Sequence, residues 1–244
     1  MINILIPMAG GTPFFDDANY YFPKPIIEVA GIPMIERVVE NLSTIKEQKR
    51  FIFVVREIDC IKFHLDKALR LLPEEEIVVI KTERDTKGAA CSSLLAMDYI
   101  NNNEQLIISN GDQIIDINFN SVLNKFYKNH IDAGSIHFDS IHPRWSYISI
   151  KKTQIVEAAE KEPISKNAIA GFYFFNQGSH FVEAAKKMIV NDAHVNGQFF
   201  IAPVFNELIL MGKKLTSEKI STSQYHTFYS PQKIEEYEKF YSPK

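Results

Sequence analysis

The sequence predicts a single α/β domain with three layers, in which helices cover both faces of a mostly parallel sheet. Two observations lead to this fold class. First, short apolar runs of strand length alternate with amphipathic segments of helical length through the first half of the chain, the pattern of right-handed β-α-β units. Second, the 244 residues contain no repeat and no low-complexity linker, so one core accommodates the whole chain.

The elements of the first half follow from their apolar spacing. The expected strands are residues 2–7, 51–55, 76–81 and 106–109. The expected helices between them are residues 32–42, 58–72 and 88–100. In open sheets of this kind ligands bind beyond the carboxyl ends of the strands. Three polar loops, 9–24, 82–88 and 110–113, fall at that edge, and we expect the functional site there.

The second half changes character, because its short strands follow one another without intervening helices. Antiparallel or mixed pairing is expected for residues 135–138, 147–151, 155–159 and 171–175. Helices at 179–190 and 198–211 follow, then two strands near Leu215 and His226. A terminal helix begins with Ser230 as its N-cap and Pro231 as its first residue. This smaller antiparallel part completes the domain.

Composition excludes several classes of protein. The net charge of −3 gives no general affinity for nucleic acid or an anionic membrane. The apolar start of the chain lacks a basic segment and is too short for a signal peptide, and no apolar run reaches the length of a membrane span. Cys60 and Cys91 lie far apart, so a reducing, cytoplasmic location is expected. The seven histidines form no metal-spaced pair.

A series of short motifs, in this order and spacing, resembles the sugar-phosphate nucleotidyltransferases, which are nucleoside-diphosphate-sugar pyrophosphorylases of GT-A-like fold. The resemblance covers nearly the whole chain and is closest to a branch associated with bacterial capsule and surface-polysaccharide biosynthesis. The motifs are residues 4–10, 23–35, 87–90, 110–113, 160–163, 170–174 and 230–232.

The resemblance implies a reaction and its partners. A nucleoside triphosphate (CTP, UTP or dTTP) would transfer its nucleotidyl group to a sugar 1-phosphate or another small phosphorylated metabolite, with release of pyrophosphate. Residues 1–130 would form the nucleotide-binding half and residues 131–244 the acceptor-binding half. Lys24, held between two prolines, would contact the reacting phosphates, and Asp112 would bind the cofactor Mg²⁺. Partners would not include nucleic acid or a membrane, and a homo-oligomer is compatible with this function.

The resemblance also assigns binding residues. Glycine N–H groups after the first strand would approach the triphosphate, Gly88 would make room for the base or ribose, and a carboxylate at Glu83 would favour cytosine. The nucleotide-binding residues would be Pro7, Met8, Ala9, Gly10, Gly11, Glu83, Gly88, Ala89 and Gly111. The acceptor-binding residues would be Trp145, Tyr147, Glu160, Lys161, Gly171 and Asn196.

Residue types alone leave plainer interpretations open. Gly10-Gly11 and the segment 110–112 are also ordinary turn signals. Glu83, Glu160 and Lys161 also fit solvated charges, Trp145 fits a core anchor equally well, and Asn196 fits the start of a helix.

The sequence departs from the resembled pattern in its phosphate loop. The family has Gly-x-Gly-[Ser/Thr]-Arg, whereas this chain has Gly10-Gly11-Thr12-Pro13-Phe14 and no arginine before Lys24. Loss of such a donor costs on the order of 10²–10³ in rate. Asp16 and Asp17 add negative charge there. Either another cation replaces the lost arginine, with Arg56, Arg84 and Arg144 as candidates, or Mg²⁺ carries more of the charge, or catalysis is slow.

Two further departures concern the metal and the acceptor. Relatives have a metal-binding aspartate before the last helix, where this chain has residues 225–229, and His226 is expected to be structural there. Tyr147 replaces a glycine and is expected to narrow the acceptor pocket. Two rival functions stay open: a GT-A glycosyltransferase, which the single carboxylate of 110–112 disfavours, and a catalytically silent nucleotide-binding protein, which the missing arginine favours.

Overall fold

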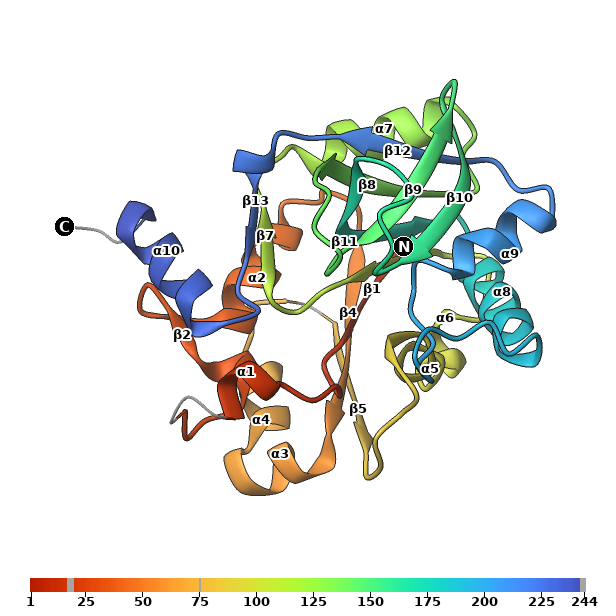
Figure 1. Cartoon of the computed structure of the whole chain (residues 1–244). Helices are drawn as coiled ribbons and strands as arrows, with labels where there is room; N and C mark the ends of the chain where they lie inside the picture. Colours follow the sequence, from red (N-terminus) through yellow and green to blue (C-terminus); the bar gives the residue numbers. More distant parts are fainter. Residues whose placement is uncertain (17–19, 75, 242–244) are drawn as a thin grey trace.

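A computed structural model describes residues 1–16, 20–74 and 76–241 (Figure 1). Within these residues, the centre of the fold is a nine-stranded mixed sheet. Its parallel part runs in the spatial order β6-β1-β4-β5. These strands are β1 (Ile2–Pro7), β4 (Lys49–Arg56), β5 (Ile77–Thr82) and β6 (Gln105–Ser109).

The second half of the chain extends this sheet with mostly antiparallel strands. β11 (Asn167–Phe175) pairs antiparallel with β6 and joins the two parts. The hairpin of β9 (Ser146–Lys151) and β10 (Gln154–Glu160) and the strand β8 (Ala133–Asp139) also pair antiparallel around β11, while β12 (Leu215–Lys219) pairs parallel with β8. The pairing of β11 with β8 shifts register between Ile169 and Tyr173, which places a bulge beside the site.

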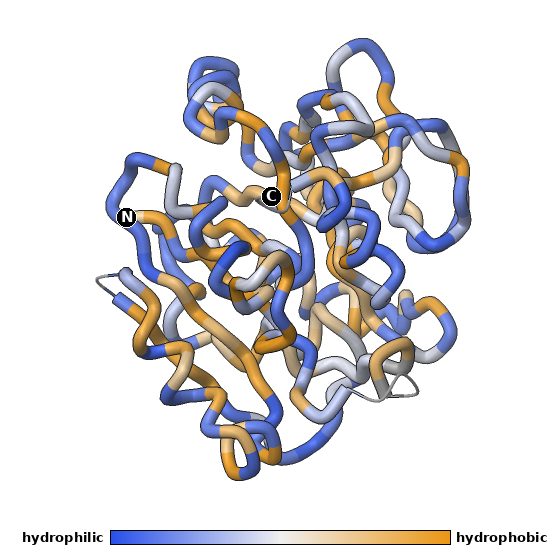
Figure 2. The backbone as a smooth tube through the Cα atoms, turned by 90° about the vertical axis from the view of Figure 1, so that its left-hand side faces the viewer, coloured by the Kyte–Doolittle hydropathy of each residue, from blue (hydrophilic) through white to orange (hydrophobic). Residues whose placement is uncertain are grey.

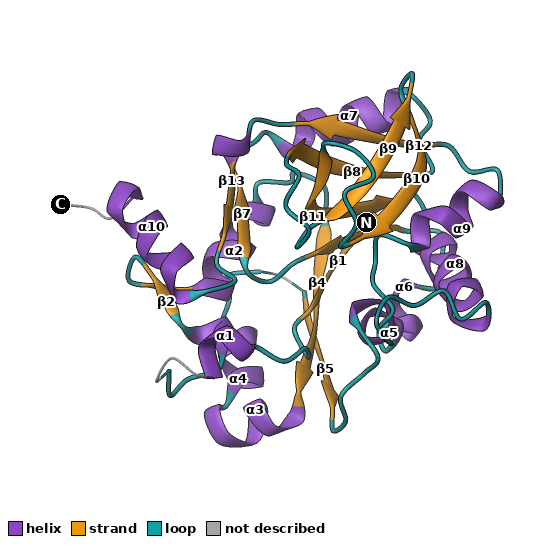
Figure 3. Ribbon diagram, viewed as in Figure 1, coloured by secondary structure: helices purple, strands orange, loops and turns teal. Residues whose placement is uncertain are grey.

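Helices cover both faces of the sheet, as Figure 3 shows. On β1, Ile4 and Ile6 belong to one core cluster and Leu5 to the other, because successive side chains of a strand point to opposite faces. The first cluster is covered by α2 (Met34–Ser43), α3 (Glu57–Phe63), α4 (Leu65–Arg70) and α7 (Phe119–Lys128). The second is covered by α5 (Ala89–Leu94), α6 (Met97–Ile100), α8 (Gly178–Val190) and α9 (Val204–Leu210). Figure 2 shows hydrophobic segments gathered in the interior.

A smaller unit lies beside the carboxyl end of the parallel strands. It contains α1 (Pro13–Asp16), the 3-10 turn η1 (Lys24–Ile26), the hairpin β2 (Glu28–Val29) and β3 (Ile32–Pro33), the pair β7 (Gln113–Ile115) and β13 (Tyr225–Thr227), the 3-10 turn η2 (Thr222–Gln224) and α10 (Pro231–Tyr241). Phe15, Ile114, Phe228 and Ile234 share a third core cluster. This cluster ties the opening loop to the last helix. No helix among the described residues is long and apolar enough to span a membrane.

The expected α/β class with a mostly parallel central sheet is confirmed, and the four parallel strands begin and end within two residues of their expected positions. Several helices differ from expectation. The expected helix 58–72 is two helices, because His64 adopts a left-handed conformation (φ 55°) between α3 and α4. The expected helix 88–100 is broken after Leu94, where the next two residues form i→i−3 bonds.

Other differences arise from long-range pairing. The expected helix 32–42 begins only at Met34, because residues 32–33 pair with 28–29. The expected helix 198–211 begins at Val204, because the segment before it bonds to the loop preceding α5. The sequence reasoning missed α7 and β7 altogether.

Candidate active site

Two adjoining cavities lie beyond the carboxyl ends of β1 and β6. The smaller has a volume of about 170 Å³ and the larger about 350 Å³, and both are lined by Asn110 and Asp112. The smaller is otherwise lined by Pro7, Met8, Gly10, Gly11, Thr12, Lys24, Pro25 and Gly111. The larger is lined mainly by residues of the second half of the chain. The two cavities thus form one continuous candidate site with Asp112 at their junction.

The glycine pair of the smaller cavity is not required by the fold. A Cβ placed on Gly10 or Gly11 would meet no atom within 4 Å, and neither residue has a positive φ. Both residues are exposed. Glycine at these positions therefore leaves the backbone N–H groups open to a ligand, which suits the close approach of an anion.

Lys24 and Asp112 form an ion pair between the two loops. Lys24 opens the turn η1 between Pro23, its N-cap, and the buried Pro25, so its backbone is stiffened on both sides. Asp112 is fixed through its carbonyl, which accepts from the Phe228 N–H at 2.7 Å. Their side chains are 15% and 25% exposed, so a ligand in the smaller cavity, which both residues line, can reach both charges.

The floor of the site is a hydrogen-bonded network around the bulge at Gly171. The Gln113 side chain donates to the Gly171 carbonyl at 2.9 Å and accepts from the Tyr225 hydroxyl at 2.9 Å. The Asn110 N–H donates to the same carbonyl at 3.1 Å. Gly171 has a φ of +57°, and a Cβ there would lie 2.2 Å from Gln113 Oε1. This position therefore requires glycine for the fold itself.

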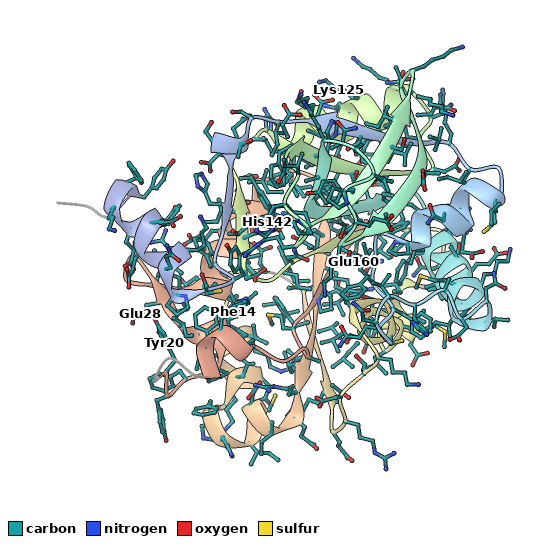
Figure 4. All side chains as sticks on the ribbon, in the orientation of Figure 1. Phe14, Tyr20, Glu28, Lys125, His142 and Glu160 are labelled. Carbon is teal, nitrogen blue, oxygen red and sulfur yellow. The ribbon has the colours of Figure 1, made fainter. Side chains whose placement is uncertain are left out.

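Glu160 places a carboxylate in the larger cavity at the end of β10. It accepts a hydrogen bond from the Ser146 hydroxyl. Burial raises the pKa of Glu160, although the Ser146 hydrogen bond and the nearby Lys161 oppose the shift. The Lys161 ammonium lies 4.7 Å from the centroid of the Phe200 ring, which lines the same cavity. Glu160 and Phe14, labelled in Figure 4, come from opposite halves of the chain and line this one cavity.

Aromatic rings form one wall of the larger cavity. Trp145 packs against Tyr225 and Tyr229, with ring centroids 5.8 and 6.3 Å apart, and Phe14 meets Tyr229 edge-on at 6.1 Å. Trp145 also packs against the core residue Phe138. The two interpretations of Trp145, a pocket wall and a core anchor, therefore both describe its position.

Most residues expected at the site meet there. Pro7, Met8, Gly10, Gly11, Lys24, Gly111 and Asp112 line the smaller cavity, and Ala89, Trp145, Glu160 and Gly171 line the larger. Ala9 is buried directly before the glycine pair.

Three expected contacts need correction. Gly88 lines neither cavity, and a Cβ there would lie 2.4 Å from the Phe199 carbonyl oxygen, so the glycine lets the two backbones dock. Tyr147 is fully buried and does not narrow the acceptor pocket; its hydroxyl donates to the His142 carbonyl at 2.7 Å. Asn196 is exposed in the turn before Gly197 and lines neither cavity.

The 82–88 loop lies apart from the smaller cavity. Glu83 lines a separate cavity of about 400 Å³ together with Arg56 and Arg84. Arg56 is held there by Asp59, with hydrogen bonds of 2.9 and 3.2 Å. Arg144 instead lines the larger cavity beside Asp112. The side chain of Asp16 and the whole of Asp17 lie outside the described residues.

His226 does not take the place of a second metal ligand. Its Nε2 atom lies 2.9 Å from the Asp116 carboxylate, and its ring packs on Tyr237 and Tyr241. In the described part of the chain, no group of three or more acidic, histidine or cysteine side chains is arranged to hold a metal ion. Asp112 is therefore the carboxylate that a metal at the junction would use.

The sequence reasoning missed the role of residues 225–229. Tyr225, Thr227 and Tyr229 line the larger cavity, while Phe228 between them is buried. This is the period-two alternation of an extended segment. The alternation is present in the sequence of residues 225–229.

Comparison with known proteins identifies the family of this chain. The family model for nucleotidyl transferases matches residues 19–217. A UTP–glucose-1-phosphate uridylyltransferase, AglF of Haloferax volcanii, is 24% identical over 81% of this chain and 79% of its own length.

Solved structures share the fold. A nucleoside-diphosphate-sugar pyrophosphorylase from Vibrio cholerae RC9 superposes with a TM-score of 0.85 at 24% identity, covering 96% of this chain and 98% of that one. An inositol-1-phosphate CTP transferase from T. maritima superposes with a TM-score of 0.74 at 15% identity, covering 98% and 96%. Because the family model matches well over half of the residues, the chain belongs to the nucleotidyl transferase family.

Proposed function

We propose that this protein transfers a nucleotidyl group from a nucleoside triphosphate to a sugar 1-phosphate or another small phosphorylated metabolite, with release of pyrophosphate. A phosphate oxygen of the acceptor attacks the α-phosphorus, a bond to that oxygen forms, and the bond to the leaving pyrophosphate breaks. Catalysis of such a reaction is mostly positioning and charge stabilisation. The proposal therefore needs one site for each substrate and charged groups where they meet.

One observation carries the proposal: Asp112, which lines both cavities, forms an ion pair with Lys24 of the smaller cavity. The smaller cavity, with Gly10 and Gly11, supports binding of the triphosphate. The larger one, with Glu160, supports binding of the acceptor, because a carboxylate accepts hydrogen bonds from sugar hydroxyls. The two phosphates that react would then meet beside Lys24.

The chemistry of the donor set fits Mg²⁺. This ion prefers oxygen ligands and keeps several waters, so one or two carboxylates with substrate phosphates suffice. Asp112 supplies the carboxylate, and Lys24 would move from it onto phosphate oxygens. A bound Mg²⁺ would neutralise charge on the reacting phosphates.

The finer assignments are part of the same proposal. CTP, UTP and dTTP are the triphosphates considered, since relatives named for UTP and CTP share this fold or sequence. Glu83 would contact the base only if a nucleotide reached the cavity beside Arg84. We place the reaction in the cytoplasm because the two cysteines are far apart in the sequence. We place its product in capsule or surface-polysaccharide biosynthesis on the motif resemblance alone.

The test is pyrophosphate release. The protein is incubated with each triphosphate, Mg²⁺ and a panel of phosphorylated metabolites, with EDTA in a parallel series. Asp112→Asn should abolish the activity seen with the best pair, whereas Asp116→Asn, an exposed aspartate beyond the cavities, should retain it. Absence of pyrophosphate across the panel, with no triphosphate raising the melting temperature, contradicts the proposal.

A further inference from the structure

The loop position that carries arginine in the resembled pattern is Phe14 in this chain. Counting along Gly-x-Gly-[Ser/Thr]-Arg from Gly10 reaches Phe14 as the fifth residue. Its ring is 58% exposed and lines the larger cavity. An apolar ring here leaves the triphosphate without the donor that the pattern supplies.

A guanidinium from the other half of the chain lies beside this position. The Phe14 ring meets the Tyr229 ring edge-on at 6.1 Å. The guanidinium carbon of Arg144 lies 4.1 Å from the centroid of the same Tyr229 ring, and 6.0 Å from that of Trp145. Arg144 and Asp112 both line the larger cavity, and Asp112 also lines the smaller one.

The backbone that carries Arg144 is fixed. The His142 carbonyl accepts from the Tyr147 hydroxyl at 2.7 Å and from the Trp145 N–H at 3.3 Å, and the His142 ring accepts from the Arg144 N–H at 3.2 Å. The buried Tyr147 thus anchors the loop that presents Arg144. The base of the side chain is held while its guanidinium is exposed on an aromatic surface.

We infer that Arg144 replaces the missing loop arginine and binds the triphosphate of the nucleotide. This inference rests on the proposed function. Before substrate binds, the Tyr229 ring holds the guanidinium through a cation–π contact, which is weak at an exposed site. A phosphate offers stronger, charge-assisted and bidentate hydrogen bonds. The guanidinium therefore leaves the ring for phosphate oxygens at the junction of the two cavities, which Asp112 lines on both sides.

The other two arginines considered as replacements do not fit. Arg56 is bound by Asp59 in two hydrogen bonds. Arg84 lines the same separate cavity as Arg56. Among the described residues that line the two site cavities, Arg144 is the only arginine. It also has no ion pair with any carboxylate in residues 1–16, 20–74 or 76–241, so phosphate would not compete with an existing partner.

The experiment compares Arg144→Ala with Arg70→Ala, which removes the same charge from an exposed position on α4. Calorimetry measures the affinity for each nucleoside triphosphate without acceptor, and pyrophosphate release gives kcat/KM. We expect Arg144→Ala to weaken triphosphate binding at least tenfold and to lower kcat/KM by about 10²-fold, as for loss of one transition-state donor. The triphosphate affinity and the kcat/KM of Arg144→Lys should lie between those of the wild type and those of Arg144→Ala, because lysine keeps the charge without the planar fork.

A rescue variant tests the position. Phe14→Arg in the Arg144→Ala background returns arginine to the loop. The double variant should bind triphosphate at least tenfold more tightly than Arg144→Ala does. Equal triphosphate affinity in Arg144→Ala and Arg70→Ala overturns the inference, and so does a change confined to the acceptor KM. A double variant no better than Arg144→Ala contradicts the placement beside Phe14. Binding is measured independently of turnover, so a wild-type protein that binds triphosphate without releasing pyrophosphate refutes the proposed function but still tests Arg144.

Discussion

Substitution of glycine by alanine should separate glycines that the fold requires from glycines that a ligand requires. Gly171→Ala forces a left-handed residue, which costs roughly 1–2 kcal/mol. Its new methyl group would lie 2.2 Å from Gln113 Oε1 and 2.3 Å from Asn110 Nδ2, and such overpacking costs about 1–3 kcal/mol. The sum is about 2–5 kcal/mol, or roughly 4–20 °C in melting temperature for a domain of this size.

Gly11→Ala should behave in the opposite way. Its methyl group meets no atom within 4 Å and its φ is not positive, so the folded state is not strained. Restriction of the unfolded chain can even stabilise such a variant by about 0.4–1 kcal/mol. The methyl group projects where the triphosphate would approach the backbone, so triphosphate affinity should fall at least tenfold.

The assays are thermal and urea denaturation, together with calorimetric titration of the triphosphate into each folded variant. The account is refuted if Gly11→Ala unfolds as readily as Gly171→Ala, or if Gly11→Ala keeps the wild-type affinity for every triphosphate that the wild type binds. The stability half of the comparison needs no knowledge of the acceptor.

Three further predictions follow from single residues. Glu160→Gln should raise the acceptor KM about tenfold or more with little change in the KM for the triphosphate, measured by pyrophosphate release. Because burial raises the pKa of Glu160, the wild type loses stability as the pH rises from about 4 through the raised pKa. The variant should therefore gain stability relative to the wild type over that pH window, measured by urea titration. Tyr147→Phe should leave the sheet intact by circular dichroism but lower triphosphate affinity severalfold, because it frees the loop of Arg144; unchanged affinity would show that the hydroxyl does not matter. His64→Gly should raise the melting temperature by about 2–4 °C, since it relieves about 1 kcal/mol of left-handed strain; a fall would show that the imidazole makes a stabilising contact.

The parallel strands β1, β4 and β6 were predictable because most of their residues are buried, on both faces of the sheet. Phe51–Val55 is a continuous apolar run, and all five residues are fully buried in β4. Such runs carry their own boundary signal, since polar residues begin where the sheet ends. α7 was predictable too and was overlooked, as Asn118 caps it and Phe119, Val122, Leu123 and Phe126 are buried at helical spacing.

Other features depend on contacts that the local sequence does not encode. The break at His64 has no glycine or proline to mark it. β7 forms because Gln113–Ile115 pairs with Tyr225–Thr227, about 110 residues away. The role of Gly88 becomes clear only when Phe199 docks on it.

The candidate site shows the same division. Lys24, Asp112 and the glycine pair stand in motifs, so the sequence placed them correctly at one edge of the sheet. Arg144 lies outside the motifs of the opening loop. It is placed near Phe14 by the Tyr229 ring, which contacts both the Phe14 ring and the Arg144 guanidinium.

Transfer of the nucleotidyl group can be followed by tracing the α-phosphate of the triphosphate. A triphosphate labelled at the α-phosphate is incubated with the protein, Mg²⁺ and a sugar 1-phosphate or related acceptor, and the products are separated. If the protein is a nucleotidyltransferase, the label appears in a nucleoside-diphosphate conjugate of the acceptor, the released pyrophosphate is unlabelled, and Asp112→Asn forms neither product. Triphosphate that binds but keeps its label across the acceptor panel would contradict the claim.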